Sequence, residues 1–479
     1  MEYQVEYTSN DSAKSEKEAF VQNSYNQTNG KGRRRFLYVL SVAAICLVAG
    51  SAFYFTRTEK TNDDNNSDDV IINTLLKSPG GKKFIISKLT ELVASYDKEG
   101  NLQEQKPSNE LISFVDRNEK SEENFRKRFG NLKNGKKIVD INFADSRFLM
   151  TNLENVNSFY LFIKEHGKKY QTPDEMQQRY LSFVENLAKI NAHNNKENVS
   201  YKKGMNRFGD MSFEEFEKKY LTLKTFDFKS NGLKSTQLIS YDDVINRYKP
   251  KDDKFDHTKY DWRLHRGVTP VKDQGDCGSC WAFSTVGVVE SQYLIRKNEL
   301  VSISEQQMVD CSLQNNGCDG GFIPRALEDI IEMKGLCSTE AYPYVGEVPE
   351  KCKYDMCDRK YKINSFFEIP EFKFKEAVRY LGPISVNIAV SDDFAFYQGG
   401  IFNGECGRTT NHAVILVGFG AEDVYDSDMN TTRKRYYYII KNSWGVSWGE
   451  RGFIRMETDI NGYRKPCLLG LEAFGVLVE

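Results

Sequence analysis

The chain has long stretches without cysteine and no excess of either charge. None of its ten cysteines lies between residues 56 and 276, so that stretch can form no disulfide. The 66 basic and 68 acidic residues leave a net charge of −2, which gives no electrostatic reason to expect a nucleic-acid partner. Only five histidines are present, so candidates for a general base or a metal ligand are few. A length of 479 residues leaves room for two or three domains.

One long hydrophobic run, residues 36–55, contains no charged residue. A helix of that length spans about 30 Å, the thickness of a bilayer core. The run follows the sequence KGRRR, so we expect residues 1–35 to be cytoplasmic and the rest to be lumenal. A cleaved signal peptide would need an unusually long leader and a clearer cleavage site, and a buried core helix is the third alternative. We expect a single-pass signal anchor.

Residues 56–150 are polar and charged, with few helical apolar patches, and are typical of a linker. From 152 to 220 the pattern predicts three helices. The first ends at Gly167, and the second begins after Thr172, with Glu175 as the return partner of a capping box. The third follows SFEE at 212–215. Glycosylation sequons on the lumenal side occur at Asn65, Asn198 and Asn430.

The second helix carries an unusual face of polar and apolar residues. The members of this face are Glu175, Arg179, Phe183, Asn186, Ile190 and Asn194. Their spacing places all six on one side of a helix, so we expect them to dock through buried polar contacts. The pattern resembles the prodomain signature of papain-type cysteine protease zymogens, and GMNRFGD at 204–210 resembles the second prodomain motif of that family. The resemblance implies an inhibitory prodomain over 151–238, with release of the mature enzyme near 235–240.

The stretch QGDCGSCWAF at 274–283 places two cysteines three residues apart. A helical pattern begins at about residue 280, so Cys280 should lie in the first helical turn, where the helix dipole favours a thiolate. Cys277 lies just outside the helix and could form a disulfide elsewhere. Such a pair could also be a redox disulfide or half of a zinc site. The chain has no second pair with suitable spacing for zinc.

A partner base for the thiolate can be sought among the histidines. His412 precedes an apolar run typical of a strand, whereas the other four lie in the predicted prodomain or at the entry to the C-terminal region. The next apolar run ends at Asn442, followed by Trp444. The amide of Asn442 could orient the imidazole, and the indole of Trp444 could exclude water from that contact.

These residues together resemble papain-family cysteine proteases, in which His and Asn follow the Cys-Gly-Ser-Cys-Trp motif by about 130–150 residues. The resemblance implies Cys280 as nucleophile, His412 as general acid and base, and Asn442 as its orienting group. It also implies the side chain of Gln274 as an oxyanion donor. The fold class implied is α+β, a papain-like two-lobe fold with a helical lobe and a β-barrel-like lobe, preceded by the helical prodomain and one transmembrane helix. No metal or organic cofactor is implied.

The resemblance also implies a disulfide framework, although the sequence alone leaves many pairings open. The implied pairs are Cys277–Cys318, Cys311–Cys352, Cys337–Cys357 and Cys406–Cys467. Cys280 then remains free. The odd number of cysteines does not exclude a Cys277–Cys280 redox pair.

Two additions distinguish the predicted mature domain, residues 239–479. One is an N-terminal extension at 241–263, and the other is a charged, hairpin-like insertion at 420–436, which places Asn442 beyond the usual spacing. With the anchored pro-region, they resemble the falcipain-type subgroup of parasite haemoglobin-degrading proteases. That resemblance implies an insertion arm that captures protein substrate, while a tolerated surface loop is the simpler alternative.

Substrate-binding residues are implied by the same resemblance. Gly320 and Gly321 leave room for an extended peptide, and Trp444 belongs to the same surface. The pocket for the second residue before the scissile bond is lined by Phe322, Ile323, Asn387, Thr410, Asn411 and Ala413, with Glu472 at its floor. This lining predicts a preference for leucine with tolerance of basic residues, and the alternative is that Glu472 is a surface residue.

The sequence therefore predicts a membrane-anchored cysteine endopeptidase zymogen that becomes active in an acidic, lysosome-like or food vacuole. Its expected partners are protein substrates, with haemoglobin suspected, and its own prodomain, while the mature form should be a monomer. Acidification should loosen the prodomain, whose contacts include Asp210. The alternatives are a processing or cytoskeleton-cleaving protease, a thiol–disulfide oxidoreductase and a catalytically inactive binding protein.

Overall fold

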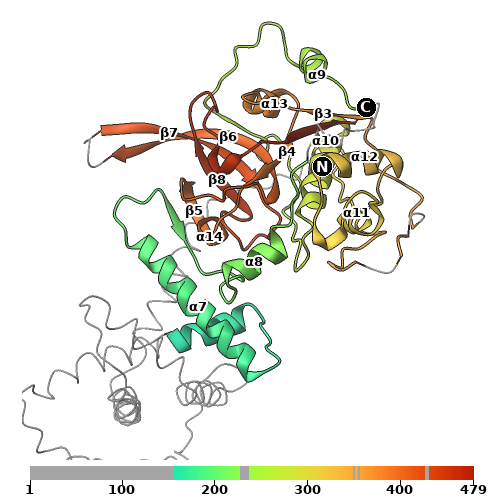
Figure 1. Cartoon of the computed structure of the whole chain (residues 1–479). Coiled ribbons are helices and arrows are strands. Elements are labelled where there is room, and N and C mark those ends of the chain that lie inside the picture. Colours follow the sequence, from blue (N-terminus) through green and yellow to red (C-terminus); the bar gives the residue numbers. More distant parts are fainter. Residues whose placement is uncertain (1–154, 227–236, 349–350, 354–355, 427–430, 479) are drawn as a thin grey trace, which may run out of the picture. The chain divides into compact units, whose positions relative to one another are not determined.

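The computed structural model describes residues 155–226, 237–348, 351–353, 356–426 and 431–478 (Figure 1). The predicted membrane span at 36–55, the linker at 56–150 and the sequons Asn65 and Asn430 lie outside these residues. Within the described part of the chain, no helix is both long and apolar enough to cross a membrane.

The chain divides into two compact units, of which the first ends at Tyr180. Its described part contains helical residues 155–165 and the first turns of α7 (Pro173–Asn194). The Phe159 ring is the centre of a small aromatic core, 5.4 Å from the ring of Tyr180 and 6.0 Å from that of Tyr170. A helix pair this short cannot form a larger core, so these ring contacts stabilise it.

The helix α7 begins where the sequence predicts, with one difference at its cap. The Thr172 hydroxyl accepts a hydrogen bond from the Glu175 backbone N–H at 3.1 Å, as expected of an N-cap. The Glu175 carboxylate, however, accepts from the backbone N–H of Gln171 at 2.7 Å. The predicted return bond to the capping residue is therefore displaced by one residue.

The second unit, residues 181–479, starts with the rest of the predicted prodomain. After α7 the chain forms β1 (Tyr201–Lys203) and α8 (Phe213–Tyr220). The buried Asn186 amide donates to the backbone carbonyls of Gly209 and Met211, at 3.0 and 2.8 Å. A buried polar contact of this kind fixes the GMNRFGD loop on the helix, as the polar face of α7 predicts.

A helical lobe follows, built around one buried helix. Its elements are α10 (Cys280–Lys297), α11 (Glu305–Cys311), the short 3₁₀ helix η2 (Gly317–Asp319) and α12 (Ile323–Glu332). Residues 280–292 of α10 are all buried, which is typical of a helix enclosed on every side. Asn298 ends α10 in a left-handed conformation, with φ of 52°. Figure 1 shows α11 and α12 beside α10 on the side away from the sheet.

The other lobe is a twisted sheet. Its strands are β2 (Tyr260–Asp261), β3 (Ser365–Glu368), β4 (Ile384–Ile388), β5 (Tyr397–Phe402), β6 (His412–Asp426), β7 (Thr431–Lys441), β8 (Phe453–Thr458) and β9 (Ala473–Leu477). Among the described residues the order is β1-β5-β8-β7-β6-β4-β9-β3, and β2 pairs with β6. The β5–β8 pair is parallel and the others are antiparallel.

The remaining short helices surround the sheet. They are α9 (Tyr241–Tyr248), α13 (Phe374–Tyr380), α14 (Asp392–Ala395) and the 3₁₀ helix η3 (Pro466–Leu468). In the N-terminal extension, α9 buries Tyr241, Val244 and Ile245, which share one helical face. The Tyr241 hydroxyl donates to Glu376 of α13 at 3.2 Å, so the extension is fixed to the sheet lobe.

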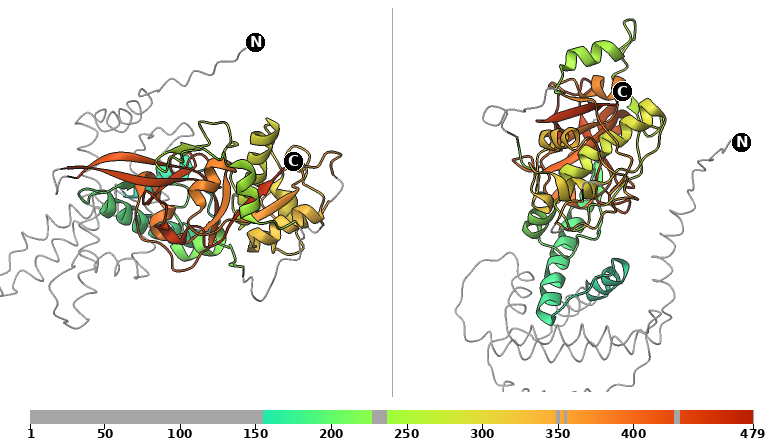
Figure 2. Two further views of the ribbon diagram at one scale, coloured as in Figure 1. Left: turned by 90° about the horizontal axis from the view of Figure 1, so that it is seen from above. Right: turned by 90° about the vertical axis from the view of Figure 1, so that its right-hand side faces the viewer.

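The insertion at 420–436 is a hairpin, as its sequence predicts. Its strands are the outer parts of β6 and β7, paired from Ala421–Tyr436 to Asp426–Thr431. Figures 1 and 2 show this β6–β7 arm extending away from α10, α11 and α12. The arm is thus a continuation of two core strands, which gives it a fixed direction.

Candidate active site

Cys280 is the first residue of α10 and is completely buried. It follows a tight turn that includes Gly275, at φ of 57°, a conformation that favours glycine. Cys277 is joined to Cys318, so Cys280 is the one unpaired cysteine of the described residues. A Cys277–Cys280 redox pair is therefore wrong for this chain.

His412, the first residue of β6, makes one side-chain hydrogen bond to Asn442, which follows β7. Its Nε2 atom lies 2.8 Å from Asn442 Oδ1. The same oxygen accepts the backbone N–H of Ser443 at 2.8 Å, which fixes the amide. The indole of Trp444 stacks on the imidazole, with ring centroids 4.8 Å apart. Among the described residues, His412 Nδ1 has no hydrogen-bond partner, so one ring nitrogen remains available for proton transfer.

The strand of His412 packs directly on the helix of Cys280. One turn after Cys280, the Ser284 hydroxyl donates to the backbone carbonyl of Val414 at 2.6 Å. Backbone groups of Ala413, the residue after His412, also bond to the Cys280 sulfur. The thiol therefore lies beside the strand that begins with His412, and a thiol, an imidazole and an amide are the groups that nucleophilic acyl transfer requires.

The charge state of this site differs from the sequence-based expectation of a thiolate. Burial raises the pKa of Cys280 to about 11, although backbone hydrogen bonds partly oppose the rise. Burial also lowers the pKa of His412 to about 4, and the bond to Asn442 opposes this only in part. Because both groups are fully buried, the neutral thiol and the neutral imidazole are the favoured forms.

Gln274 connects the thiol helix to the loop that carries Asn442. Its Nε2 atom donates to the backbone carbonyl of Cys277 at 3.0 Å, and its Oε1 atom accepts from the Ser443 hydroxyl at 2.7 Å. The Gln274 backbone N–H also donates to the Ser443 carbonyl at 2.9 Å. The side-chain amide is thus positioned by both lobes.

A segment in the last part of the predicted prodomain lies across this site. In this cleft segment, residues 222–226, the Thr222 hydroxyl donates to the carbonyl of Gly278 at 2.6 Å. The Leu223 N–H donates to the Asn411 carbonyl at 3.2 Å, and the Lys224 N–H donates to the Gly321 carbonyl at 2.9 Å. Backbone pairing of this kind is how a strand-like peptide binds a groove.

The glycine at 320 permits this close approach. A Cβ atom there would lie 1.9 Å from the backbone oxygen of Thr222, and the residue has a φ of 102°. Any other residue would therefore push the cleft segment away. The structure places Gly320 and Gly321 beside an extended peptide, where the sequence predicts them.

The end of the cleft segment enters the predicted pocket. Phe226 is buried, its ring lies 5.8 Å from that of Phe322, and its N–H donates to Glu472 Oε1 at 2.7 Å. Glu472 is 4% exposed, so the alternative of a surface glutamate is wrong. Burial raises the pKa of its carboxyl to about 7, while the Phe226 bond opposes the rise.

Backbone and side-chain contacts bring the other predicted pocket residues to the same place. The Thr225 and Thr410 hydroxyls lie 3.1 Å apart. Asn387 is paired with Ala413 in the sheet, and its Oδ1 atom accepts the N–H of Glu472 at 3.0 Å. Ile323 is fully buried at the start of α12, behind the pocket wall.

The prodomain also contacts the region around the indole of Trp444. The rings of Phe208 and Phe216 lie 5.4 and 5.3 Å from it, both edge-on. Arg207 pairs with Asp273, next to Gln274. These aromatic and charged contacts cover the indole of Trp444 and the turn next to Gln274.

A second set of charged contacts joins the prodomain to the sheet lobe. Lys203 pairs with Asp393, and the Tyr201 hydroxyl donates to the same carboxylate at 2.9 Å. Burial raises the pKa of Asp393, but the Lys203 contact outweighs it, so that the pKa lies below the ordinary value of 3.8. Lys219 instead joins the prodomain to the turn before Cys280, because it pairs with Asp276 at 2.8 Å.

Four disulfides hold the catalytic region. They are Cys277–Cys318, Cys311–Cys352, Cys337–Cys357 and Cys406–Cys467. These are the pairs that the family resemblance implied. Throughout the described ranges there is no group of three or more His, Cys, Asp or Glu residues that could hold a metal ion.

Comparison with known proteins gives consistent matches. The sequence matches the family described as papain family cysteine protease over residues 257–474, and the cathepsin propeptide inhibitor domain (I29) over 159–216. Falcipain-3 of Plasmodium falciparum is 52% identical over 492 residues, and falcipain-2a is 45% identical over 494, with all of each chain covered. Digestive procathepsin L 3 of Tenebrio molitor has a TM-score of 0.57 at 33% identity, covering 68% of this chain and 99% of its own.

Proposed function

The chain belongs to the papain family of cysteine proteases and carries that family's inhibitory prodomain, and from this premise we propose that Cys280 is its nucleophile. The protein is a cysteine endopeptidase zymogen of papain-like fold. The observation that supports the proposed site best is the 2.8 Å contact between His412 and Asn442, with the other ring nitrogen unbonded within the described residues and Cys280 next to the same strand.

The proposed mechanism is acyl transfer in two stages. With the cleft open, Cys280 passes its proton to His412 and the thiolate attacks the scissile carbonyl. The Cys280 N–H and the Gln274 side-chain amide stabilise the oxyanion. His412, oriented by Asn442, then protonates the leaving amine, and water hydrolyses the acyl-enzyme with His412 as the base. The indole of Trp444 shields the imidazole–amide bond from water.

The proposed organisation follows the sequence-based boundaries. Residues 36–55 anchor the precursor in the membrane, with residues 1–35 as the cytoplasmic tail. Residues 151–238 form the inhibitor that processing removes, and residues 239–479 form the mature, monomeric peptidase. The mature enzyme acts in an acidic vacuole after acidification has loosened the prodomain.

We expect the Glu472 carboxyl to decide whether basic residues are accepted in the specificity pocket. In the zymogen the buried Phe226 ring lies beside Phe322 and its N–H bonds to Glu472, which supports a pocket that accepts a large apolar side chain. Leucine should therefore be preferred. Glu472→Ala should reduce cleavage of a peptide with Arg in the pocket, relative to the same peptide with Leu there, by about tenfold, because a buried cation would lose its counter-charge. The measurement is the kcat/KM ratio for two peptides that differ only at that residue.

A matched control separates charge from shape. Glu472→Gln keeps the size of the side chain and its bond to the Phe226 N–H, so it should lower the Arg-to-Leu ratio almost as much as the alanine variant. An unchanged ratio in both variants would show that Glu472 does not select the substrate.

We further propose that the physiological substrate is haemoglobin, captured by the β6–β7 arm. The arm carries acidic and basic side chains, Arg455 pairs with Glu422 at its base, and Tyr425 near its tip is 62% exposed. Replacing residues 421–436 by a two-residue turn should lower the rate of haemoglobin digestion at least tenfold. The kcat/KM for a Leu-Arg fluorogenic peptide should stay within twofold, because the arm lies away from Cys280.

The arm experiment distinguishes the proposed substrate from the alternatives. Equal losses on haemoglobin and peptide would mean that the arm supports folding of the sheet rather than substrate capture. Haemoglobin digestion that does not change would identify the arm as a tolerated surface loop. Glu422→Gln, which weakens the ion pair at the arm's base and leaves the Arg455–Glu450 pair in place, should give an intermediate loss on haemoglobin only.

A further inference from the structure

Glu290 is a completely buried carboxylate on α10, about three turns after Cys280. Its Oε1 atom accepts from Lys272 Nζ at 2.6 Å and from the Ile303 N–H at 2.7 Å. Its Oε2 atom accepts from the Thr269 hydroxyl at 2.7 Å. Both oxygens therefore accept hydrogen bonds, from donors in two separate parts of the chain, residues 269–272 and Ile303.

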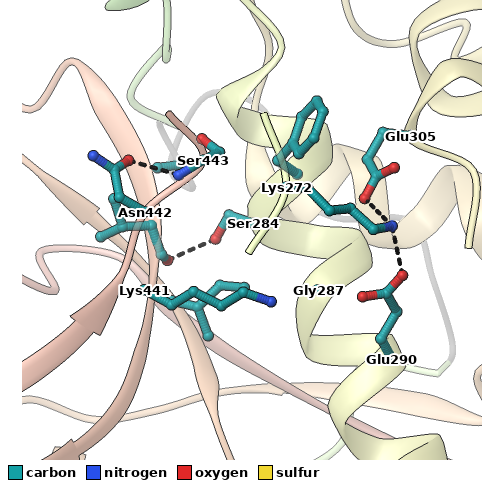
Figure 3. A pocket seen from close by; sticks show the side chains of 12 residues that line it. Lys272, Ser284, Gly287, Glu290, Glu305, Lys441, Asn442 and Ser443 are labelled. Atoms are coloured by element: carbon teal, nitrogen blue, oxygen red, sulfur yellow. Dashed lines mark hydrogen bonds and ion pairs between the residues drawn. The ribbon is translucent and has the colours of Figure 1, made fainter. Parts of the chain in front are cut away.

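Two lysines and a second glutamate complete this Glu290 network, which we define as Lys272, Glu290, Glu305, Thr269 and Lys441. Lys272 also donates to Glu305 at 2.7 Å. The Lys441 side chain comes from the end of β7, and its Nζ atom donates to the Thr269 hydroxyl at 3.1 Å. Figure 3 shows Lys272 between the two glutamates and Lys441 extending toward them from the sheet lobe.

The Glu290 network contains two lysines and two glutamates, and burial raises the pKa of Glu305 to about 7 although Lys272 opposes the rise. Burial lowers the pKa of Lys441 to about 8, while Glu290 and Glu305 act in the opposite direction, so the ammonium is charged at neutral and acidic pH. A cavity with a volume of ≈ 20 Å³ lies among these side chains, enough for about one water molecule. Fully buried charges are usually a poor source of stability compared with apolar packing, so their presence here suggests another role.

The two lysines of the Glu290 network are close in sequence to proposed catalytic residues. Lys272 stands two residues before Gln274, and Lys441 stands directly before Asn442. The two loops also meet directly, because the Gly445 N–H donates to the Lys272 carbonyl at 3.1 Å. Through the network, Glu290 thus joins the helix that begins at Cys280 to the segments that carry Gln274 and Asn442.

We propose that Lys441 and Glu290 are positioning residues, which set the register of the Asn442 and Gln274 loops relative to the helix of Cys280. Neither residue touches substrate. Hydrogen bonds are directional, so this network holds the two lobes at one distance and angle, whereas apolar packing would tolerate small shifts. Misplacing a catalytic group by about 1 Å can cost about 100-fold in rate. The proposal rests on the protease activity and not on the proposed substrate.

The test uses the full-length zymogen with Lys441→Met, and with the smaller change Thr269→Val. An unrelated aspartic protease converts each zymogen, so that maturation does not depend on the variant's own activity. Rates are normalised by active-site titration with an irreversible thiol reagent. We expect kcat for a Leu-Arg peptide to fall at least tenfold while KM stays within twofold, because binding is intact and the transition state is misaligned. The pH profile of Cys280 alkylation should shift as well.

Lys375→Met is the matched control. Lys375 is a second buried lysine, whose ammonium donates to the carbonyls of His257 and Ile460 at 3.0 and 2.9 Å, and burial lowers its pKa to about 8. It lies under the N-terminal extension rather than beside the site. We expect this variant to lower Tm without changing kcat or the alkylation profile.

Three outcomes decide the proposal. A lower Tm with unchanged kcat in both network variants would overturn the proposal. A fall in kcat that is no larger in the network variants than in Lys375→Met would also overturn it. A double variant, Lys441→Met with Thr269→Val, should lose no more activity than Lys441→Met alone, because the two groups act as one unit. An inactive wild-type enzyme would instead contradict the protease function itself.

Discussion

Replacing Cys280 by alanine should abolish peptide hydrolysis and leave the zymogen folded. The side chain is small, it forms no disulfide, and its removal leaves the four cross-links of the catalytic region intact. Loss of a nucleophile in such a group of cooperating residues costs on the order of 10⁶-fold in kcat. The measurement is hydrolysis of the Leu-Arg peptide after conversion by an aspartic protease, with the wild type processed in parallel.

A variant of the neighbouring cysteine provides the comparison. Changing both Cys277 and Cys318 to alanine removes a disulfide but leaves Cys280 and His412 in place. This variant should have a lower Tm and retain measurable turnover, since the cross-link acts on stability. If Cys280→Ala kept turnover and the double variant lost it, the assignment of the nucleophile would be wrong, and reduction of insulin would be the next assay.

The parts of the site that the sequence predicts are those carried by local motifs. Cys280 follows a turn and begins a helix, and His412 and Asn442 stand at the ends of two apolar runs, so each position can be inferred from its own neighbours. The hairpin at 420–436 can be predicted for the same reason, because its strands continue those runs. The disulfide pairs could be obtained only from the family resemblance, since spacing alone does not decide them.

The parts that were missed depend on contacts between distant segments. The cleft segment at 222–226 is held by backbone bonds to Gly321 and Asn411. Backbone bonds do not depend on the type of side chain, so this segment has no pattern that would predict its position. The helix α9 was also missed, although Tyr241, Val244 and Ile245 have helical spacing. A short amphipathic helix within a charged stretch gives a weak signal.

Burial of charge was equally invisible in the sequence. Glu290 and Lys441 look like ordinary surface residues, since such side chains are rarely fully buried unless they are paired. The neutral state of Cys280 was missed for a related reason. The helix dipole favours a thiolate, but the prodomain removes water from the site, and desolvation outweighs the dipole.

Opening of the zymogen should be driven by protonation of His412 between about pH 6.5 and pH 4. In the closed state burial lowers the pKa of this imidazole from 6.5 to about 4. Once the cleft opens, water reaches the ring and its pKa returns toward the ordinary value. The closed state then binds fewer protons than the open state in this window, so it loses stability as pH falls. A shift of this size corresponds to about 3 kcal/mol.

Other titratable groups also change the stability of the closed state with pH, and their effects differ in sign. The pKa of Glu472 is raised to about 7 in the closed state, so between pH 7 and its ordinary value of 4.5 this carboxyl favours closure as pH falls. This effect of Glu472 opposes that of His412 only as far as Glu472 is buried by the prodomain and not by the pocket itself. The pKa of Asp393 is lowered, so its contact with Lys203 is lost only below about pH 3.8. Of these three groups, His412 is the one that destabilises the closed state in the mildly acidic window.

The test follows opening by tryptophan fluorescence in full-length Cys280→Ala zymogen, which cannot process itself. Trp444 is buried against Phe208 and Phe216, so its emission should shift to longer wavelength when the prodomain leaves. Adding His412→Gln should move the opening midpoint below about pH 4, because the titrating group is gone. Adding Glu472→Gln instead should move it to higher pH. Identical midpoints in all three proteins would show that neither group controls opening, and a shift of both variants in the same direction would contradict the signs derived from their burial.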